Sequence, residues 1–526
     1  MALPVVREVG NLERYSLARG NAGVYFNVLV GPRLKLQHAT LQLPQDTAQW
    51  VDLLKGPLAH LIKQHTALSV VFGGPFSAKP VFLRLPSIDI ASVVRVTEIG
   101  EAQQVTQVLE QEHARPFDVT DQTLPLWRLI VARVKSDDSF YLIYNFHHSI
   151  GDGRSGMVFT EQLLERLNVQ AAESPSSSDA STSTLVTSPE GPLPLTLEER
   201  VSCKPSIGLL LKEASVSLLL PASLKKALQR KHWVGDFAAT LDAPHESQVG
   251  IFHLDRAETS QIVKAAKAHN NTVQAILFAA SVFAVKAVFL SSTKAAAGNT
   301  NNSNKEKDSK STVATTTKDA ISFSTPVALR PLISPPIAPE DQGCFPSEFV
   351  TNNIQIGLGT MFWDLAQTYR QRLVRKTQTP KGINHLLQHV GLLAYLPNKP
   401  NGWEDYIKSL VKKEHGGRQS TLMISNLGRA WDQDPATTAA AFQVLDSAFS
   451  QSAFTPGPAI TLGASTANGV LSITATWQKA TFSNRDRPER YLKEFRRILL
   501  EATATLPERK EYRFQEALLP VATEKK

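Results

Sequence analysis

The chain has 526 residues, a formal net charge of +8, and a composition that is 42% hydrophobic and 20% charged. This length favours two large domains over one, and the composition is that of a globular protein with enough apolar residues for a large core. No block of basic residues with interleaved aromatic residues occurs, so nucleic acid is not an expected partner, whereas the mild positive charge suits an acidic ligand such as a phosphorylated cofactor.

Compartment and metal content follow from a few absences in the sequence. The two cysteines, Cys203 and Cys344, have no metal-ligand spacing, so neither a disulfide framework nor a metal site is expected. The first 20 residues lack the apolar run of a signal peptide, and we expect no segment to be apolar for long enough to cross a bilayer. The sequence therefore predicts a cytoplasmic monomer, with contact to the endoplasmic reticulum or to lipid droplets as an alternative.

The first half of the chain mixes helical and strand patterns. Apolar periodicity predicts helices at residues 50–68, 101–114 and 156–167, and strands at 80–85, 92–99, 126–134 and 140–147. A turn at Ser136, Asp137 and Asp138 joins the last two strands.

Two segments of low complexity interrupt this pattern, residues 171–192 and residues 291–318. The first is rich in Ser, Thr and Pro, and the second in Ser, Thr, Asn and Lys. Neither buries enough apolar surface to offset its ordering entropy. We expect the first to be the crossover between two lobes and the second to be a flexible surface insertion.

The second half repeats the mixture of elements. Helices are predicted at 257–268, 272–289 and 488–504, and strands at 320–327, 422–425 and 470–476. Two halves of mixed strands and helices predict a two-lobed α/β architecture, with an N-terminal lobe at 1–195 and a C-terminal lobe at 196–526.

Residues 209–233 combine leucine clusters with basic residues at their end. One interpretation is a segment that lies on an anionic membrane. Pro221 breaks any single long helix, and the interpretation that we favour is a pair of core-packed helical pieces with a basic tip.

The stretch from Asn145 to Gly153 is the most informative in the chain. His147 and His148 are expected at the end of the strand 140–147, where successive side chains point to opposite faces and cannot easily share a metal ion. A neutral imidazole there is a plausible general base near neutral pH. A structural pair of histidines that closes the strand is an equally good interpretation.

Asp152 and Gly153 also have two interpretations. Asp152 is a favoured N-cap for a helix that begins directly after it, and Gly153 suits a tight turn. Alternatively, Asp152 pairs with a buried arginine and fixes the shape of the loop. Arg330, which follows the predicted strand at 320–327, is the candidate partner.

The pattern HHxxxDG, complete here at residues 147–153, resembles the acyl-CoA-dependent acyltransferase superfamily, which includes chloramphenicol acetyltransferase and the condensation domains of peptide synthetases. Three further stretches look like motifs of the fungal alcohol O-acetyltransferases within it. They are Gly10–Tyr15 with Asn21–Tyr25, Thr325–Pro331, and Ile424–Gly428.

This resemblance implies two chloramphenicol-acetyltransferase-like lobes, a pseudodimer, with a central substrate tunnel. Acyl-CoA, most simply acetyl-CoA, would be a co-substrate, and a small-molecule alcohol or amine would be the acceptor. By position, His148 matches the catalytic base of the family. Asp152 matches the structural aspartate, which would pair with Arg330, and Gly153 matches the glycine that leaves room at the tunnel. His147 is then a structural neighbour. No acyl-enzyme is implied, and the residues that would contact CoA are not assigned.

Ser425 and Asn426 are the candidates for stabilising the oxyanion of the intermediate, although a plain turn is a slightly better interpretation of this sequence. The leading hypothesis is acetyl transfer to an alcohol hydroxyl. The alternatives are N-acetylation of an amine such as a long-chain base, or a non-catalytic binding protein of the same fold.

Overall fold

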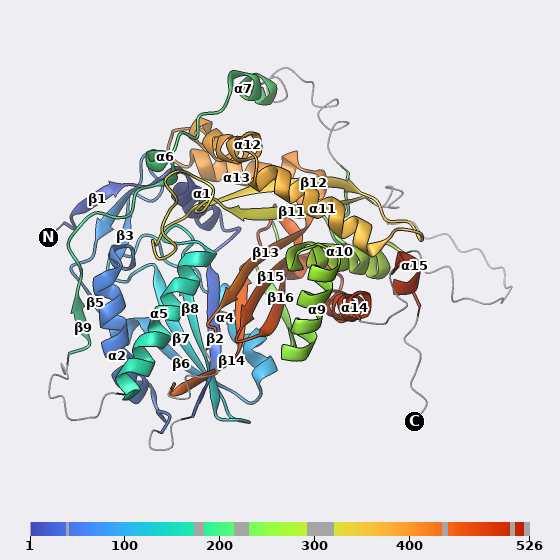
Figure 1. Cartoon of the computed structure of the whole chain (residues 1–526). Coiled ribbons are helices and arrows are strands. Elements are labelled where there is room, and N and C mark those ends of the chain that lie inside the picture. Colours follow the sequence, from blue (N-terminus) through green and yellow to red (C-terminus); the bar gives the residue numbers. More distant parts are fainter. Residues whose placement is uncertain are drawn as a thin grey trace, which may run out of the picture.

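The computed structural model describes residues 2–37, 42–172, 183–214, 231–291, 320–433, 440–504 and 511–519. Within these residues, two large mixed sheets are covered by helices, as Figure 1 shows. The architecture is thus the predicted two-lobed α/β fold. The insertion predicted at 291–318 lies outside the described residues apart from Ser291.

The first sheet has five strands in the order β14-β2-β8-β7-β6. Their bounds are β14 (Phe442–Gln451), β2 (Val28–Leu36), β8 (Ser139–Phe146), β7 (Trp127–Val134) and β6 (Val94–Ile99). Helices α2 (Thr47–Gln64) and α5 (Gly153–Ala172) pack on one face, and α4 (Val105–His113) packs on the other. Side chains of β8 alternate between these two cores, as a period of two requires: Phe140 and Leu142 face α2 and α5, while Tyr141 and Ile143 face α4.

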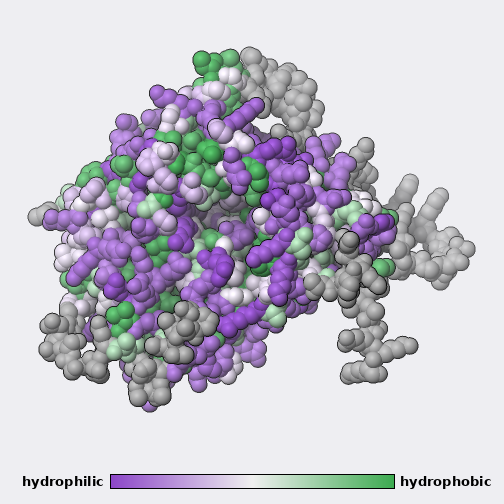
Figure 2. Space-filling view, viewed as in Figure 1, coloured by the Kyte–Doolittle hydropathy of each residue, from purple (hydrophilic) through white to green (hydrophobic). Residues whose placement is uncertain are grey.

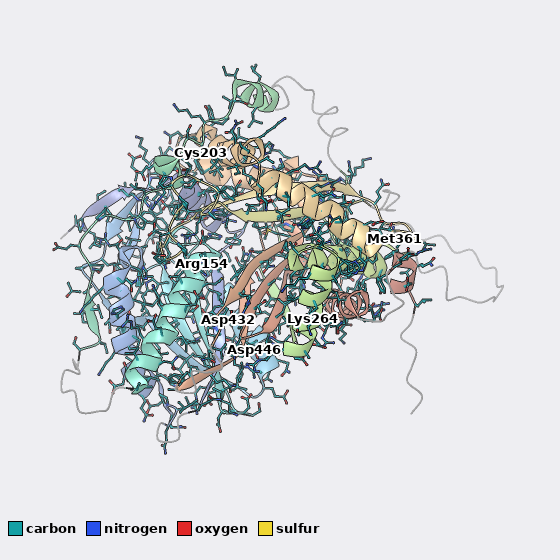
Figure 3. The ribbon with its side chains drawn as sticks, in the orientation of Figure 1. Arg154, Cys203, Lys264, Met361, Asp432 and Asp446 are labelled. Carbon is teal, nitrogen blue, oxygen red and sulfur yellow. The ribbon has the colours of Figure 1, made fainter. Side chains whose placement is uncertain are left out.

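The edge strand of this sheet comes from the second half of the chain. β14 runs antiparallel to β2 along its whole length. Arg33 Nε on β2 donates to Asp446 Oδ2 on β14 at 2.8 Å, and Figure 3 labels Asp446. The division into lobes at residue 195 stays a prediction. Because β14 pairs with β2, a strand from beyond residue 195 completes the first sheet.

Smaller elements surround this sheet. α1 (Asn11–Asn21) precedes β2, and a three-stranded sheet has the order β1-β4-β3. Its strands are β1 (Val5–Glu8), β4 (Val81–Arg84) and β3 (Val70–Gly73). β5 (Ser87–Asp89) pairs with β9 (Leu185–Thr187), so the segment 171–192, interpreted as structureless from its composition, contains a short strand. The one-turn helix α3 (Ile90–Val93) starts the segment that was predicted as strand at 92–99.

The second sheet has six strands in the order β10-β16-β15-β13-β11-β12. Their bounds are β10 (Ser247–Leu254), β16 (Val470–Gln478), β15 (Pro458–Ala467), β13 (Ser420–Ala430), β11 (Ile321–Ala328) and β12 (Pro346–Ile354). The described helices that follow β10 in the chain are α9 (Arg256–Ala268), α10 (Val273–Val285), α11 (Phe362–Thr377), α12 (Pro380–Gly391), α13 (Gly402–Lys413), α14 (Asp486–Thr503) and α15 (Phe514–Ala517). The core of this half lies between the sheet and α10, α11 and α14.

The apolar window Val273–Leu290, which contains α10, corrects one expectation from the sequence. Its mean hydropathy of 2.1 and its length suffice to cross a membrane, so the prediction that no segment could do so was wrong for this window. Most of the window is buried inside the protein, and all of α10 from Ala275 onward is buried. α10 thus has the surroundings of a core helix, which is apolar on all sides because it is covered on all sides.

α7 (Ile207–Ala214), which follows the short helix α6 (Leu197–Arg200), stands out from the body of the protein. Its apolar side chains form the isolated hydrophobic patch at the top of Figure 2. Ile207 is 76% exposed and Leu211 is 64% exposed, so the core-packed interpretation of this region is wrong for α7. The continuation at 215–230 lies outside the described residues.

Candidate active site

The HHxxxDG motif forms the loop that joins β8 to α5. β8 ends at Phe146, one residue earlier than predicted, so both histidines lie in the turn that follows it. The N–H of Ile150 donates to the carbonyl of His147 at 3.1 Å and closes this turn. The hydroxyl of Ser149 donates to the carbonyl of Glu13 at 2.6 Å, which ties the loop to α1. A loop fixed in this way holds its side chains in one place.

His148 is half-buried and contacts residues from both halves of the chain. Its Nδ1 lies 3.6 Å from Sγ of Cys344, and its ring centroid lies 6.1 Å from that of Tyr25. Burial and the nearby cation of Arg19 lower the pKa of His148 to about 4, against the opposing effects of backbone hydrogen bonds and Asp152. The imidazole is therefore neutral near pH 7 and is free to accept a proton.

His147 has different surroundings. Its side chain is only 2% exposed and lies edge-on to the rings of Phe72 and Phe117. Its Nδ1 accepts the backbone N–H of Ser149 at 3.2 Å. Burial and the neighbouring His148 lower its pKa to about 3. These contacts are those of a neutral histidine that shapes the loop.

Asp152 and Arg330 form the contact that the sequence predicted. Arg330 Nη2 donates to Asp152 Oδ1 at 3.0 Å and Arg330 Nε donates to Oδ2 at 3.3 Å. Asp152 also accepts the backbone N–H of Ser155 at 3.0 Å, as an N-cap of α5 does, and that of Phe345 at 3.2 Å. Arg330 Nη1 donates to the carbonyl of Asp341 at 2.6 Å. Asp152 is therefore both the N-cap of α5 and the partner of Arg330, so both interpretations are confirmed. The ion pair joins the motif to the second half of the chain.

Gly153 is the first residue of α5 and faces β13. A Cβ at this position would overlap Cδ2 of Leu427. The glycine therefore leaves room for a side chain of the other lobe, which is a contact between lobes and not a property of the turn.

Ser425 and Asn426 lie on β13, two residues or fewer from Leu427. Asn426 is exposed, its amide donates to Gln274 Oε1 at 3.1 Å, and its Oδ1 accepts the N–H of Gly428 at 2.9 Å. In the part of the chain that the structure describes, neither residue is among the contacts of His148. The contact of Asn426 with Gly428 is typical of a turn, as one of the two interpretations predicted. An oxyanion role for Ser425 or Asn426 stays a prediction.

A cavity of about 70 Å³ lies beside Tyr25, and no pattern in the sequence indicates it. Tyr25, which contacts His148, also lines this cavity together with Arg19 of α1 and Glu348 of β12. Tyr25 ends the stretch Asn21–Tyr25 that supported the resemblance, so a signal for it was present. Arg19 and Glu348 lie outside every motif quoted above, and a single sequence does not reveal that they share a cavity.

A model of the family described as alcohol acetyltransferase matches residues 101–499, which is more than half of the chain. An uncharacterized protein of Schizosaccharomyces pombe is 25% identical over 429 residues, covering 80% of this chain and 81% of that protein. The probable alcohol acetyltransferase crmB of Aspergillus fumigatus is 28% identical over 172 residues, covering 31% of this chain and 37% of that protein.

Solved structures share the fold at low sequence identity. The trichothecene 15-O-acetyltransferase TRI3 of Fusarium sporotrichioides superposes with a TM-score of 0.60 at 12% identity, covering 94% of this chain and 95% of that one. The first condensation domain of the calcium-dependent antibiotic synthetase superposes with a TM-score of 0.58 at 14% identity, covering 98% of this chain and all of that domain. The fold is therefore the two-lobed fold of chloramphenicol-acetyltransferase-like and condensation proteins.

Proposed function

The chain belongs to the alcohol acetyltransferase family and is an acyltransferase, and on this basis we propose that it transfers an acetyl group from acetyl-CoA to the hydroxyl of an alcohol, with His148 as general base. The observation that carries this proposal is the position and charge state of His148. Its imidazole is held in a closed turn, its pKa is lowered to about 4, and its ring neighbour Tyr25 lines a cavity.

The proposed step is a direct transfer. Nδ1 of His148 faces Cys344, so Nε2 is the nitrogen that we assign to the acceptor. Nε2 takes the hydroxyl proton while the oxygen attacks the thioester carbonyl, and the carbon–sulfur bond breaks as the tetrahedral intermediate collapses. The proton then passes from the imidazolium to the departing CoA thiolate, which leaves an ester, free CoA and a neutral histidine.

The remaining residues of the motif act by placing His148. Asp152 is occupied by Arg330 and by two backbone N–H groups, so we give it no contact with substrate. We also propose that acetyl-CoA and the acceptor reach His148 through a tunnel between the lobes. The cavity lined by Tyr25 supports this route because its other lining residues come from α1 in the first half and from β12, β13 and β15 in the second.

The test uses the purified full chain with acetyl-CoA and a panel of alcohols and amines, and it follows the release of free thiol. We expect release that depends on an alcohol, and we expect His148→Ala to lower kcat by at least about 100-fold, as removal of a general base does. His60→Ala is the matched control because His60 is exposed on α2. Mass analysis of the product separates an ester from an amide.

Two results would overturn the proposal. One is the absence of thiol release with every acceptor, and the other is an equal rate for the wild-type protein and His148→Ala. An amide product with no ester would move the assignment to N-transfer.

A further inference from the structure

Arg418, which lies two residues before β13, is a buried cation whose hydrogen-bond partners are all neutral. The residue is only 2% exposed. Its Nη1 donates to the carbonyls of Thr455 at 3.0 Å and Pro458 at 3.4 Å. Its Nη2 donates to the hydroxyl of Thr481 at 2.6 Å. In the part of the chain that the structure describes, no carboxylate forms an ion pair with this guanidinium.

The charge of Arg418 is therefore left without compensation inside the protein. Burial lowers the pKa of Arg418 to about 10, and no carboxylate among the described residues opposes this shift. A pKa near 10 still leaves the guanidinium charged at pH 7. Burial of a charge is costly unless an opposite charge accompanies it. Arg330, which is similarly buried, has such a partner in Asp152.

A cavity of about 10 Å³ is lined by Arg418 itself. Thr455 and Gln478 line it as well, together with residues of the segment between Ala238 and Pro244. A volume of this size is close to the space that one water needs, so the cavity has room for one small ligand and is too small for a phosphate group.

The residues that line this cavity can donate hydrogen bonds to an anion. Nε of Arg418 is buried and has no hydrogen-bond partner among the described residues. Thr455 Oγ1 accepts from Gln478 Nε2 at 3.2 Å, and a hydroxyl that accepts in this way still has its own proton to donate. The hydroxyl of Thr240 donates to Asp242 at 3.1 Å, but Asp242 is exposed, so water solvates its charge. The lining therefore offers donors around one buried positive charge.

We propose that this cavity is a binding site for one small monovalent anion of the size of chloride, held by Arg418 with Thr455 as a second donor. A water in the same place would satisfy Nε but would leave the buried charge without a counter-ion. Because Arg418 joins the start of β13 to Thr455 and to Pro458 at the start of β15, the anion should stabilise the fold there. None of these residues has a part in the proposed transfer, so the site does not depend on that function.

The experiment is thermal unfolding of the full chain at constant ionic strength, with chloride replacing gluconate, which is too large for the cavity. An anion that binds only the folded protein raises Tm with its concentration. We expect each tenfold increase in chloride to raise Tm by roughly 1–2 °C once the site begins to fill. Bromide should act in the same way, and Arg418→Met should abolish the dependence. Thr455→Val, which removes one donor and keeps the arginine, should weaken it.

Arg429→Met is the matched control. Arg429 belongs to β13, but its side chain is 76% exposed and pairs with Asp432. This variant should keep the chloride dependence of the wild-type protein. General effects of the salts on stability act on all the variants, so the difference between the wild-type protein and Arg418→Met isolates the site.

Two results would overturn the proposal. If Tm of the wild-type protein is the same in chloride and in gluconate, the cavity holds at most a water. If the dependence on chloride persists in Arg418→Met, the anion binds elsewhere. Should Arg418→Met fail to fold, Thr455→Val decides in its place, since an unchanged chloride dependence in that variant refutes the site and a weakened one supports it.

Discussion

Asp152 and Arg330 lie 178 residues apart in the chain and are joined by two hydrogen bonds of 3.0 and 3.3 Å. Their side chains are only 10% and 5% exposed. The pair also holds Ser155 and the loop at Asp341–Gly343, because Arg330 Nη2 donates to Ser155 Oγ at 3.0 Å and to the carbonyl of Gly343 at 3.1 Å. The HHxxxDG loop of one half is therefore positioned by a cation of the other half.

Arg330→Met should destabilise the protein by about 3–5 kcal/mol, because it leaves the carboxylate of Asp152 buried without its cation. Urea unfolding measures this change, and kcat should fall with it as the turn at His148 loosens. Asp432→Asn is the control, since the ion pair of Asp432 with Arg429 is exposed on both sides and should contribute at most about 1 kcal/mol. Equal effects of the two substitutions would contradict the positioning role.

Gly153→Ala should destabilise the protein by less than about 1 kcal/mol, because the new methyl group overlaps only Cδ2 of Leu427, the end of a half-buried side chain that can move aside, and alanine favours the helix. Leu427→Ala removes the overlapping atoms, so the double variant should be more stable than the sum of the two single variants predicts. A thermal unfolding series of the four proteins measures the coupling. If the stability changes of the two single variants simply add up in the double variant, Gly153 does not serve to make room for Leu427.

In the proposed mechanism the neutral imidazole of His148 is the active form, and its pKa is lowered to about 4. The pH dependence of kcat/KM should therefore have its acid limb near pH 4, well below the ordinary histidine value. Arg19→Met removes a cation that contributes to this lowering, so the limb should move to higher pH. Rates for hexanol, whose own ionisation does not change in this range, give the cleanest profile. A limb near pH 6.5 in the wild-type protein would contradict this account.

Stability should fall as the pH drops below 6.5. The pKa of His113 and of His147 is lowered to about 3 by burial, so below pH 6.5 the unfolded chain binds protons that the folded chain does not, and each pH unit down to about 3 favours unfolding. Urea midpoints at pH 7 and pH 5 measure the slope. His113→Gln, which removes one of these groups, should flatten it, and an unchanged slope would assign the effect to other groups.

Substitution of Cys344 distinguishes direct transfer of the acetyl group from a route with a covalent acetyl-enzyme intermediate. Its Sγ lies 3.6 Å from His148 Nδ1, but burial raises the pKa of the thiol well above its ordinary value, which disfavours the nucleophilic thiolate. Direct transfer predicts that Cys344→Ala keeps kcat within about tenfold of the wild-type value, as expected when no nucleophile is lost. Inactivity of Cys344→Ala, or an acetyl adduct on Cys344 in rapidly quenched samples, would replace direct transfer by a two-step route.

The parts of the fold that the sequence predicted well are those with local signals. β7 and β8 were found because continuous apolar runs flank the turn at Ser136–Asp138. α9 and α14 were found because their apolar residues recur at helical spacing, and α10 because its apolar run is too long for a strand. β2 was missed because Gly31-Pro32 indicates a break. In the structure the backbone of Leu142 approaches so closely that a Cβ at Gly31 would overlap it, so the glycine is needed inside the strand.

Strands β14 and β15 were missed for a different reason. They are buried on both faces and rich in small residues, so they lack the alternation that marks a half-exposed strand. In the site, the contact of Asp152 with Arg330 was predictable because both residues lie in motifs. The cavity that Arg19 and Glu348 share was not, because its lining comes from elements that lie far apart in the chain, and no local pattern marks it.

The pairing of β14 with β2 sets the order in which the protein can mature on the ribosome. The first sheet lacks its edge strand until residue 451 has been synthesised, and until then the hydrogen-bonding groups along the open side of β2 have no partner from their own chain. An exposed strand edge readily pairs with other chains. Nascent chains that stop before β14 should therefore be the species that depend on chaperones, and separate expression of residues 1–195 should give aggregates that are rescued by co-expression of the remainder.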